Sequence, residues 1–527
     1  MSTSSWDFVI VGSGFGGSVS ALRLVEKGYR VLVLEKGRRL GPDDFPKTNW
    51  DLKRWLWRPE LGFRGLFNMT FLPDVTALSG VGVGGGSLVY ANTLPTPKDD
   101  FFEAPSWSTL ARWKEELRPH YQSARRMLGA VQNPRLTLVD DVLKSVAEDI
   151  GRKDGFHATD VAVYFGSPGV TVKDPFFGGE GPDRTGCNSC GGCMLGCRFG
   201  AKNTLDKNYL YLAEKRGLVI QPDTEVTWVQ PAAGGGYDVD ARSGSATQSF
   251  HAANVIFAGG VLGTVDLLLR LKESEQGLPR LSDAVGNFVR TNSEVLLGIV
   301  SERRDVDLSK GIAIGSILHT DEHSHIEPVR YPAGAGFFRM LALPHAPGAT
   351  VVERLTHAAG LVLRHPWKTA KAWLVPDWAK ATMILLYMRT TDGHLRMKLG
   401  RTPQTGMKRG LTTEAAAGSR PSASIPEATE LAERVAQKLD GYPQSMLTET
   451  LMGIPTTAHI LGGACMGESA SSGVIDHRHR VFGYEGLYVI DGSAVSANPG
   501  VNPALTITAL AERAMSFIPD RAYPASA

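Results

Sequence analysis

The sequence predicts an α/β protein whose chain starts in a strand–helix–strand unit. Residues 7–11 form a short β-branched run that leads into glycines, residues 18–27 show a helical pattern, and residues 30–34 form a second apolar strand. Residues 255–258 form another buried strand that ends in two glycines, which indicates that the chain returns to the same sheet. We therefore expect a Rossmann-like nucleotide-binding domain assembled from discontinuous segments, together with an α+β domain.

Length and composition limit the class of protein. With 527 residues, of which 43% are hydrophobic and 21% charged, the chain can form two or three globular domains. The net charge of +2 gives no sign of a basic nucleic-acid-binding surface, so we expect no nucleic-acid partner. The sequence contains neither an apolar run of about 18 residues nor a secretory signal pattern at its start. The expected location is the cytoplasm, with contact at the periphery of a membrane left open.

The first glycine-rich turn has the G-x-G-x-x-G pattern. Gly12, Gly14 and Gly17 occupy its glycine positions, and Glu35 closes the second strand 23 positions after Gly12. Gly12 permits the tight turn, Gly14 lets the backbone approach a pyrophosphate, and Gly17 lets the helix pack on the strand. Glu35 is placed to accept hydrogen bonds from a ribose. The pattern predicts a dinucleotide but does not separate NAD from FAD, since both contain an ADP half.

A second glycine-rich run and the C-terminal segment point to the flavin. Residues 80–94, GVGVGGGSLVYANTL, resemble the second flavin signature of the glucose-methanol-choline (GMC) oxidoreductases. HILGGACMG and LYVIDGSAVSANPGVNPALTITALAERA, near the end of the chain, resemble the C-terminal signature of that family. The first 30 residues and CRFGAKNTLDKNYL are most similar to the bacterial, and particularly the actinobacterial, cholesterol oxidases within it.

The resemblance implies a flavin-binding domain with FAD and a substrate domain whose sheet covers the flavin. We assign residues 1–100, 187–300 and 456–527 to the first, and residues 101–186 and 301–455 to the substrate-binding or lid domain. Some family members attach FAD through a histidine near the second glycine run; residues 80–93 contain none, so we expect non-covalent FAD. The expected FAD contacts are Gly12, Gly14, Gly17 and Glu35 at the ADP half, Gly85, Gly86, Ser87 and Asn92 near the isoalloxazine or ribityl chain, Val226 at the adenine, and Asp491, Gly492 and Pro503 in the rest of the pocket.

His459 and Asn502 are the expected catalytic pair. Oxidation of an alcohol needs a base or strong acceptor within about 3 Å of the hydroxyl oxygen, and histidine suits neutral pH. His459 precedes a double glycine and matches the family's catalytic histidine, while Asn502 matches its second catalytic position. Ile460 replaces the proline that usually follows the histidine, which leaves the imidazole in place. Asn502 could also cap a helix over residues 504–515.

The expected substrate is a hydrophobic alcohol, with a sterol or 3-hydroxysteroid first. We expect hydride transfer from a secondary hydroxyl to flavin N5, with His459 as the base; a flavin-dependent steroid desaturase or reductase, using a tyrosine acid, is an alternative. Cholesterol oxidases carry a glutamate for double-bond isomerisation shortly after a Pro-Ala-Gly segment, and residues 332–337 contain none. Glu327 could take this role, or it could form a buried ion pair with Arg330.

Four cysteines fall within eleven residues. Cys187, Cys190, Cys193 and Cys197 have the C-x2-C-x2-C-x3-C spacing of a bacterial ferredoxin run, which would hold a [4Fe–4S] cluster. Arg198 replaces the proline that usually follows the last cysteine, and structural thiols or a zinc site are the alternatives. A cluster would pass electrons to an external carrier, as in a long-chain or cyclic alcohol dehydrogenase, whereas its absence favours O2 as the acceptor.

Residues 350–378 are amphipathic. Leu, Val and Trp alternate with Arg and Lys at roughly helical spacing around Pro366. This segment could dip into a membrane surface. We favour the other interpretation, a pair of surface helices that pack on the core.

Overall fold

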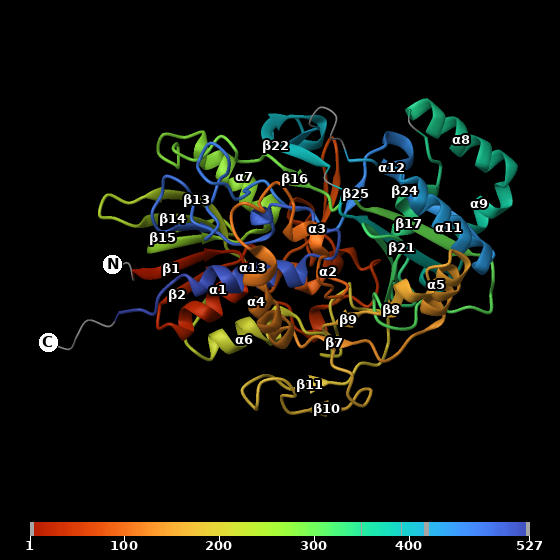
Figure 1. Ribbon diagram of the computed structural model, residues 1–527, viewed down its shortest axis with the longest axis horizontal. Helices are drawn as coiled ribbons and strands as arrows, with labels where there is room; N and C mark the ends of the chain where they lie inside the picture. The colour runs from red at the N-terminus through yellow and green to blue at the C-terminus, as the bar shows by residue number, and fades with distance from the viewer. Residues whose placement is uncertain (1–4, 349, 392, 416–420, 523–527) are drawn as a thin grey trace.

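The computed structural model of the protein describes residues 5–348, 350–391, 393–415 and 421–522. Two seven-stranded sheets lie toward opposite ends of an elongated molecule (Figure 1). The first has the strand order β12 (Val219–Gln221), β2 (Val31–Leu34), β1 (Trp6–Val11), β15 (Ala246–Phe257), β14 (Tyr237–Ser243) and β13 (Glu225–Pro231), with β26 (Leu487–Val489) also paired to β15. β12, β2, β1, β15 and β26 pair in parallel, and β13, β14 and β15 form antiparallel hairpins. The predicted Rossmann-like α/β fold is confirmed.

Helices cover both faces of the first sheet. They are α1 (Phe15–Glu26), α4 (Trp113–Met127), α6 (Tyr209–Glu214), α7 (Gly260–Lys272) and α13 (Ala504–Ser516). Figure 1 shows α7 above the strands and α1 and α6 below them. The end of the chain is fixed to its start, because Arg23 of α1 donates two hydrogen bonds of 2.8 Å to Glu512 of α13. The C-terminal segment is thereby held beside the first glycine turn.

The second sheet is antiparallel throughout. Its order is β20 (Ala342–Pro344), β24 (Gly441–Met446), β17 (Val295–Ser301), β21 (Thr382–Arg389), β19 (Ser324–Val329), β18 (Ser316–His319) and β8 (Phe156–Ala158). Side chains alternate between its faces. On β17, Val295, Leu297 and Ile299 belong to a core with α5 (Leu138–Asp149) and α11 (Pro426–Leu439), whereas Leu296 and Gly298 border a cavity on the other face. One face of the sheet is therefore structural and the other faces the candidate site.

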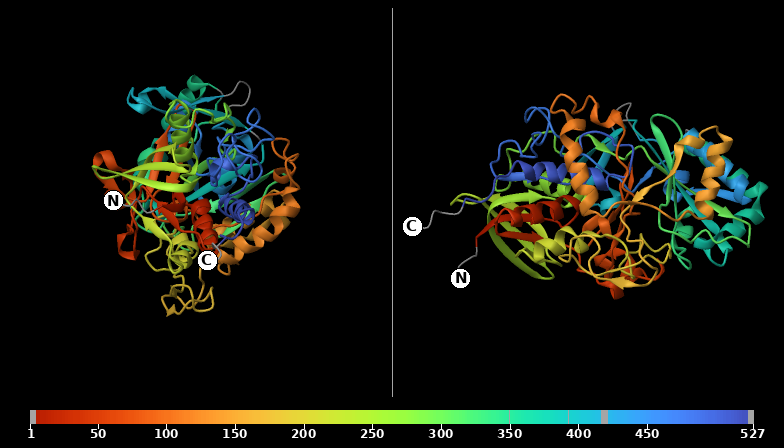
Figure 2. Two further views of the ribbon diagram at one scale, coloured as in Figure 1. Left: turned by 90° about the vertical axis from the view of Figure 1, so that its left-hand side faces the viewer. Right: turned by 60° about the horizontal axis from the view of Figure 1, so that its bottom comes forward.

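Smaller elements join the two sheets, as the rotated views of Figure 2 show. The remaining strands form sheets of two or three: β16 (Val289–Arg290), β22 (His394–Arg401) and β23 (Arg409–Ala415); β25 (Thr456–Thr457), β6 (Thr76–Gly80) and β5 (Phe67–Phe71); β10 (Thr171–Val172) and β11 (Arg184–Thr185); β3 (Trp57–Arg58) and β4 (Phe63–Arg64); β7 (Val131–Gln132) and β9 (Asp160–Val161). The remaining α-helices are α2 (Leu52–Trp55), α3 (Asp99–Phe102), α8 (Val351–Arg364), α9 (Pro366–Leu374), α10 (Trp378–Ala381) and α12 (Leu447–Met452). No helix within the described residues is long and apolar enough to cross a bilayer.

Two helices depart from the expected packing. The amphipathic segment forms α8 and α9, and α9 begins at Pro366, where proline's fixed φ suits a first helical position. Arg354 is the buried residue of α8, and Ala372 is that of α9. The expected pair of surface helices is therefore present and contacts α12, β20 and β24, but most of its apolar side chains stay exposed instead of packing on the core.

Candidate active site

The first glycine-rich turn contains glycines of two kinds. Gly12 has a φ of +97°, and a Cβ atom added there would lie 2.5 Å from the carbonyl oxygen of Ala258. A Cβ added to Gly17 would lie 2.1 Å from the carbonyl oxygen of Gly12. At Gly14 the nearest atom would be 4.0 Å away. Gly12 and Gly17 thus serve close packing of the chain on itself, whereas Gly14 leaves its backbone open to a ligand.

The Glu35 carboxylate holds this turn in shape. Its Oε2 accepts hydrogen bonds from the backbone N–H of Ser13 at 3.0 Å and from the Ser13 hydroxyl at 2.7 Å. Its Oε1 accepts the N–H of Gly37 at 2.9 Å. The backbone N–H of Gly84 donates to Ser13 Oγ at 3.0 Å, which links the turn to the second glycine run. Glu35 therefore organises the loop, and its contact with a ribose stays a prediction.

The second glycine run lies against the first. A Cβ atom added to Gly85, whose φ is +52°, would lie 2.7 Å from the Cα atom of Gly14. The Ser87 hydroxyl donates to the carbonyl oxygen of Gly84 at 2.7 Å and fixes the loop from inside. Gly85 and Ser87 thus shape the loop, while Gly86 between them borders the cavity.

One large cavity lies between the glycine loops and the second sheet, with an open interior of about 370 Å³. The predicted residues that border it are Gly14, Gly86, His459, Asp491, Gly492, Asn502 and Pro503. Apolar side chains form a large part of the rest of its wall, among them Leu296, Ile314, Val329, Phe338, Trp378, Ile384 and Leu386. The other predicted cofactor residues do not border the cavity: Gly12, Gly17, Glu35, Gly85, Ser87, Asn92 and Val226. Asn92 is fully buried and Val226 is half-buried in β13.

His459 is brought to this cavity by β25, which pairs in parallel with β6 just before the second glycine run. Its Nδ1 lies 2.5 Å from Oε2 of Glu294, a side chain with 0% exposure. The other oxygen of Glu294 accepts the backbone N–H of Ala458. Burial by itself would lower the pKa of His459, but the Glu294 carboxylate, with a smaller contribution from Glu327, raises that pKa above its usual value. With Nδ1 held by Glu294, Nε2 is left to face the cavity.

A further buried carboxyl stands close to this pair. Glu449 of α12 accepts the backbone N–H of Thr456 at 3.1 Å. Burial, with a smaller contribution from the nearby charge of Glu294, raises the pKa of Glu449 to about 8. Glu449 therefore carries a proton at neutral pH, which avoids a second negative charge beside Glu294.

Asn502 and Asp491 complete the polar side of the cavity. Oδ1 of Asn502 is buried and, within the described part of the chain, has no hydrogen-bond partner. Pro503 is the N-cap of α13 and no side chain caps the helix, so the capping role considered for Asn502 is wrong. Oδ2 of Asp491 accepts the N–H of Gly260 at 2.9 Å and the hydroxyl of Thr264 at 2.6 Å. Asp491 thereby fixes the start of α7 at the edge of the cavity.

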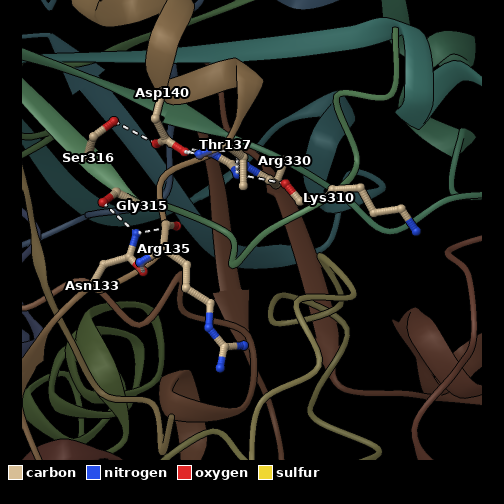
Figure 3. A network of polar contacts seen from close by, with 8 residues as sticks. All are labelled: Asn133, Arg135, Thr137, Asp140, Lys310, Gly315, Ser316 and Arg330. Carbon is tan, nitrogen blue, oxygen red and sulfur yellow. Dashed lines mark hydrogen bonds and ion pairs between the residues drawn. The ribbon is translucent and has the colours of Figure 1, made fainter. Parts of the chain in front are cut away.

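Arg330 pairs with Asp140 rather than with Glu327. Figure 3 shows the Arg330 guanidinium directed at Asp140, with Nη2 3.2 Å from Oδ2. Its Nη1 donates to Thr137 Oγ1 at 2.7 Å and to the carbonyl oxygen of Lys310 at 2.8 Å. The considered ion pair between Glu327 and Arg330 is therefore wrong. Asp140 lies 190 positions away on α5, and no local sequence pattern indicates this contact.

Glu327 is a fully buried carboxyl on the cavity side of the second sheet. It lies two positions before Val329 on β19, so both side chains point to the same face, and Val329 borders the cavity. Its Oε1 is 3.5 Å from Nε2 of His325. Within the described residues neither carboxylate oxygen of Glu327 makes a hydrogen bond.

The four cysteines line a separate small cavity. They are Cys187, Cys190, Cys193 and Cys197, and all four are free thiols. Burial raises the pKa of Cys187 to about 12 and lowers that of the neighbouring Lys202 to about 7. Across the described ranges, no group of three or more His, Cys, Asp or Glu side chains is placed to hold a metal ion. The structure therefore gives no support to the predicted [4Fe–4S] cluster or to zinc. It favours structural thiols, of which Cys187 is buried and the other three are half-buried.

The large cavity fits FAD. A Cβ atom added to Gly260 or Gly263 would meet nothing within 4 Å, and both residues border the cavity, as does Gly14. These positions form a cradle of exposed backbone at the starts of α1 and α7, and the positive end of a helix dipole suits the anionic pyrophosphate.

Comparisons with known proteins agree with this geometry. Models of the GMC oxidoreductase family match residues 181–274 and 395–511, and a model of NAD(P)-binding Rossmann-like domains matches residues 10–78. Cholesterol oxidases from Acinetobacter baumannii and Mycobacterium tuberculosis (strain ATCC 25618 / H37Rv) are each 44% identical to the chain over 98% of its length, covering 94% and 91% of those proteins. Pyridoxine 4-oxidase from Mesorbium loti has a similar fold, with a TM-score of 0.63 and 15% identity over 97% of this chain and 99% of its own.

Proposed function

The chain belongs to the GMC oxidoreductase family, and from this premise we propose that it oxidises the secondary hydroxyl group of a sterol or another 3-hydroxysteroid. Membership itself establishes an FAD-dependent oxidoreductase that acts on CH–OH groups. The observation that carries the finer proposal is the Glu294–His459 pair at the border of an apolar cavity.

His459 takes the proton of the substrate hydroxyl. When the C–H bond of the alcohol carbon breaks and its hydride leaves, the O–H proton must also leave to give the ketone. Nε2 of His459 can accept that proton only in the neutral imidazole, while Glu294 stabilises the imidazolium that results. Asn502 holds the substrate oxygen by donating a hydrogen bond from its Nδ2 amide group. Its buried Oδ1 can only accept a hydrogen bond and has no partner in the described part of the chain. We assign no residue to double-bond isomerisation.

FAD is proposed to bind non-covalently along the glycine loops. Bound FAD supplies the two-electron acceptor for the hydride at N5. Gly14, Gly86, Asp491, Gly492 and Pro503 border the space that it would occupy. In this proposal the remaining predicted contacts either shape the loops or contact the more distant parts of the cofactor. They are Gly12, Gly17, Glu35, Gly85, Ser87, Asn92 and Val226.

A sterol is the favoured substrate for two reasons. The wall opposite the glycine loops is built from aliphatic and aromatic side chains, among them Phe338 and Trp378, which suit a rigid hydrocarbon. The two relatives at 44% identity are both described as cholesterol oxidases. Long-chain or cyclic alcohols are the competing substrates within the same chemistry.

The electron acceptor is proposed to be O2, with an external carrier as the competing acceptor. The cysteine cavity shows no metal-binding arrangement within the described residues, so no electron is routed through it. The proposed location is the cytoplasm.

The test is product analysis with the purified FAD-loaded protein. We expect a 3-hydroxysteroid to yield the 3-ketone by mass spectrometry, with O2 consumed in equal amount. If ketone forms only when an artificial electron carrier is added, the acceptor is an external carrier and not O2. Failure to form ketone from the steroid, with turnover of a long-chain alcohol, would contradict the sterol assignment.

A further inference from the structure

Helices α8 and α9 form an exposed arm at the end of the molecule opposite the two chain termini (Figure 1). α8 packs on α12 and β20, and α9 packs on α8 and β24. Together the helices contain 23 residues, and Arg354 and Ala372 are the buried ones. A helix in a globular protein normally buries an apolar stripe, so most of this arm is unpartnered.

The exposed side of the arm is strongly apolar. Leu363, Trp367 and Leu374 are 80%, 79% and 78% exposed, the three highest values among the large apolar side chains of the described residues. The further exposed apolar residues on the two helices are Val351, Val352, Leu355, Val362 and Trp373. Eight exposed apolar residues within 24 positions are more than the singly scattered apolar residues of an ordinary surface.

Positive charge flanks this apolar surface. Residues 351–374 contain four Arg or Lys residues and one Glu, and Arg354 is the one basic residue among them that is buried. Arg364 and Lys371 are exposed and Lys368 is half-exposed, all close to Trp367 in sequence. Lys371 lies 3.9 Å from the half-buried Glu302, at the outer limit of an ion pair, and its side chain stays 64% exposed. The arm therefore complements a surface that is apolar inside and anionic outside.

The arm is continuous with the wall of the large cavity. Trp378, four positions after the end of α9, borders the cavity, as do Ala342 at the start of β20 and Met446 directly before α12. Arg339 also donates to the carbonyl oxygen of Val375, just beyond α9, at 2.8 Å. A ligand that enters beside the arm would therefore meet the substrate wall first.

We propose that α8 and α9 dock the enzyme on an anionic lipid bilayer, with Leu363, Trp367 and Leu374 inserted below the headgroups and the basic residues at the phosphates. Such helices lie in the plane of the interface, and their binding strength grows with apolar area and with attraction to anionic lipid. The inference rests on the proposed function, because a hydrophobic alcohol partitions into the bilayer and would enter the cavity from there.

The test is co-sedimentation of the full-length FAD-loaded protein with vesicles of phosphatidylcholine alone or with 30% phosphatidylserine. We expect the wild type to sediment with the anionic vesicles and to be released in part by about 0.5 M salt, because salt screens the charges. The double variant Leu363→Ser/Trp367→Ser should lose about tenfold or more in partitioning, since it removes the most exposed apolar groups.

The matched control is Val170→Ser/Met407→Ser, which replaces two exposed apolar residues elsewhere on the surface. It should bind vesicles like the wild type. Equal binding by the Leu363→Ser/Trp367→Ser variant, or wild-type protein that stays in the supernatant with anionic vesicles, overturns the proposal. A wild-type dimer that this variant converts to a monomer, without vesicle binding, would assign the arm to self-association instead.

Activity separates this inference from the proposed function. On a sterol held in vesicles the Leu363→Ser/Trp367→Ser variant should lose at least about fivefold in rate, and on the same sterol in detergent micelles it should match the wild type. Vesicle binding without sterol turnover would refute the proposed function and leave the docking surface intact. Full turnover in micelles without vesicle binding would refute the docking surface and leave the proposed function intact.

Discussion

The side of the large cavity that His459 borders and the small cavity lined by the four cysteines were both predicted from short sequence patterns, but their surroundings in the fold differ. His459 receives a buried partner from a distant segment, Glu294, and borders a cavity large enough for a ligand. The four cysteines share a small cavity with Lys202, and no metal-binding group is found there among the described residues. Sequence spacing can therefore place side chains near one another, but residues from distant segments of the chain determine whether those side chains have the partners that catalysis or metal binding requires.

The largest effect is expected at His459. His459→Gln should lower kcat for the alcohol by about 10³-fold, because His459 is the one histidine among the described residues that border the cavity. The measurement is steady-state ketone formation with FAD content matched between proteins. His345→Gln, at a half-buried histidine whose Nε2 lies 2.9 Å from Thr429 Oγ1, is the control and should keep wild-type kcat. A His459→Gln variant within tenfold of wild type would remove the base assignment.

Glu294 is expected to act as a positioning residue through His459. Because Glu294 raises the pKa of His459, the neutral base predominates only above a pH higher than the usual histidine value, and the rate should rise with pH through that point. Glu294→Gln should lower kcat by about 10- to 100-fold and shift this limb of the kcat profile to lower pH. Glu302→Gln, just beyond the other end of β17, should change neither. An unshifted limb in Glu294→Gln would assign Glu294 a structural role only.

Glu449 is expected to affect stability more than rate. Its pKa is raised to about 8 by burial, so between its ordinary pKa of 4.5 and about 8 the unfolded chain loses this proton while the folded protein keeps it. The free energy of unfolding should therefore fall as pH rises across this window, by on the order of 5 kcal/mol. Glu449→Gln cannot ionise and should flatten this fall in urea titrations at pH 5 and pH 8. An equal fall in both proteins would contradict the buried protonated state.

The smallest effect is expected at the cysteines. Cys190→Ser should leave kcat and the flavin spectrum within about twofold of wild type, because a structural thiol that does not touch the substrate can be replaced by an isosteric hydroxyl. The measurement pairs these assays with iron and acid-labile sulfide analysis of both proteins. Stoichiometric iron in the wild type, lost together with activity in Cys190→Ser, would reverse the contrast between the two regions.

Local sequence patterns were enough to predict the fold class and part of the candidate site. The strand–glycine–helix unit was predictable because its packing glycines and turn lie within about twenty residues, although α1 begins at Phe15, three residues before the expected start. His459 and Asn502 could be located from local sequence and do border the cavity. Glu294 could not, because it lies 165 positions before His459 and precedes a plain apolar strand.

Neither the ion pair of Arg330 nor the exposure of α8 and α9 could be predicted, because both depend on how distant parts of the chain pack together. The choice of Asp140 over Glu327 as the partner of Arg330 depends on how α5 packs against the second sheet, which no local pattern encodes. The amphipathic pattern of α8 and α9 predicted helices, but periodicity cannot tell a buried stripe from one left in solvent. The division into two domains, with its boundaries, stays a prediction.

The role of His459 in steroid oxidation is tested most directly by the anaerobic reduction of bound FAD by a 3-hydroxysteroid in a single turnover, followed at the flavin absorbance near about 450 nm. We expect rapid bleaching in the wild type, with a rate that rises with pH through the raised pKa of His459, and bleaching about 10³-fold slower in His459→Gln. Wild-type flavin that stays oxidised with the steroid, or bleaching that is equally fast in His459→Gln, would contradict this role.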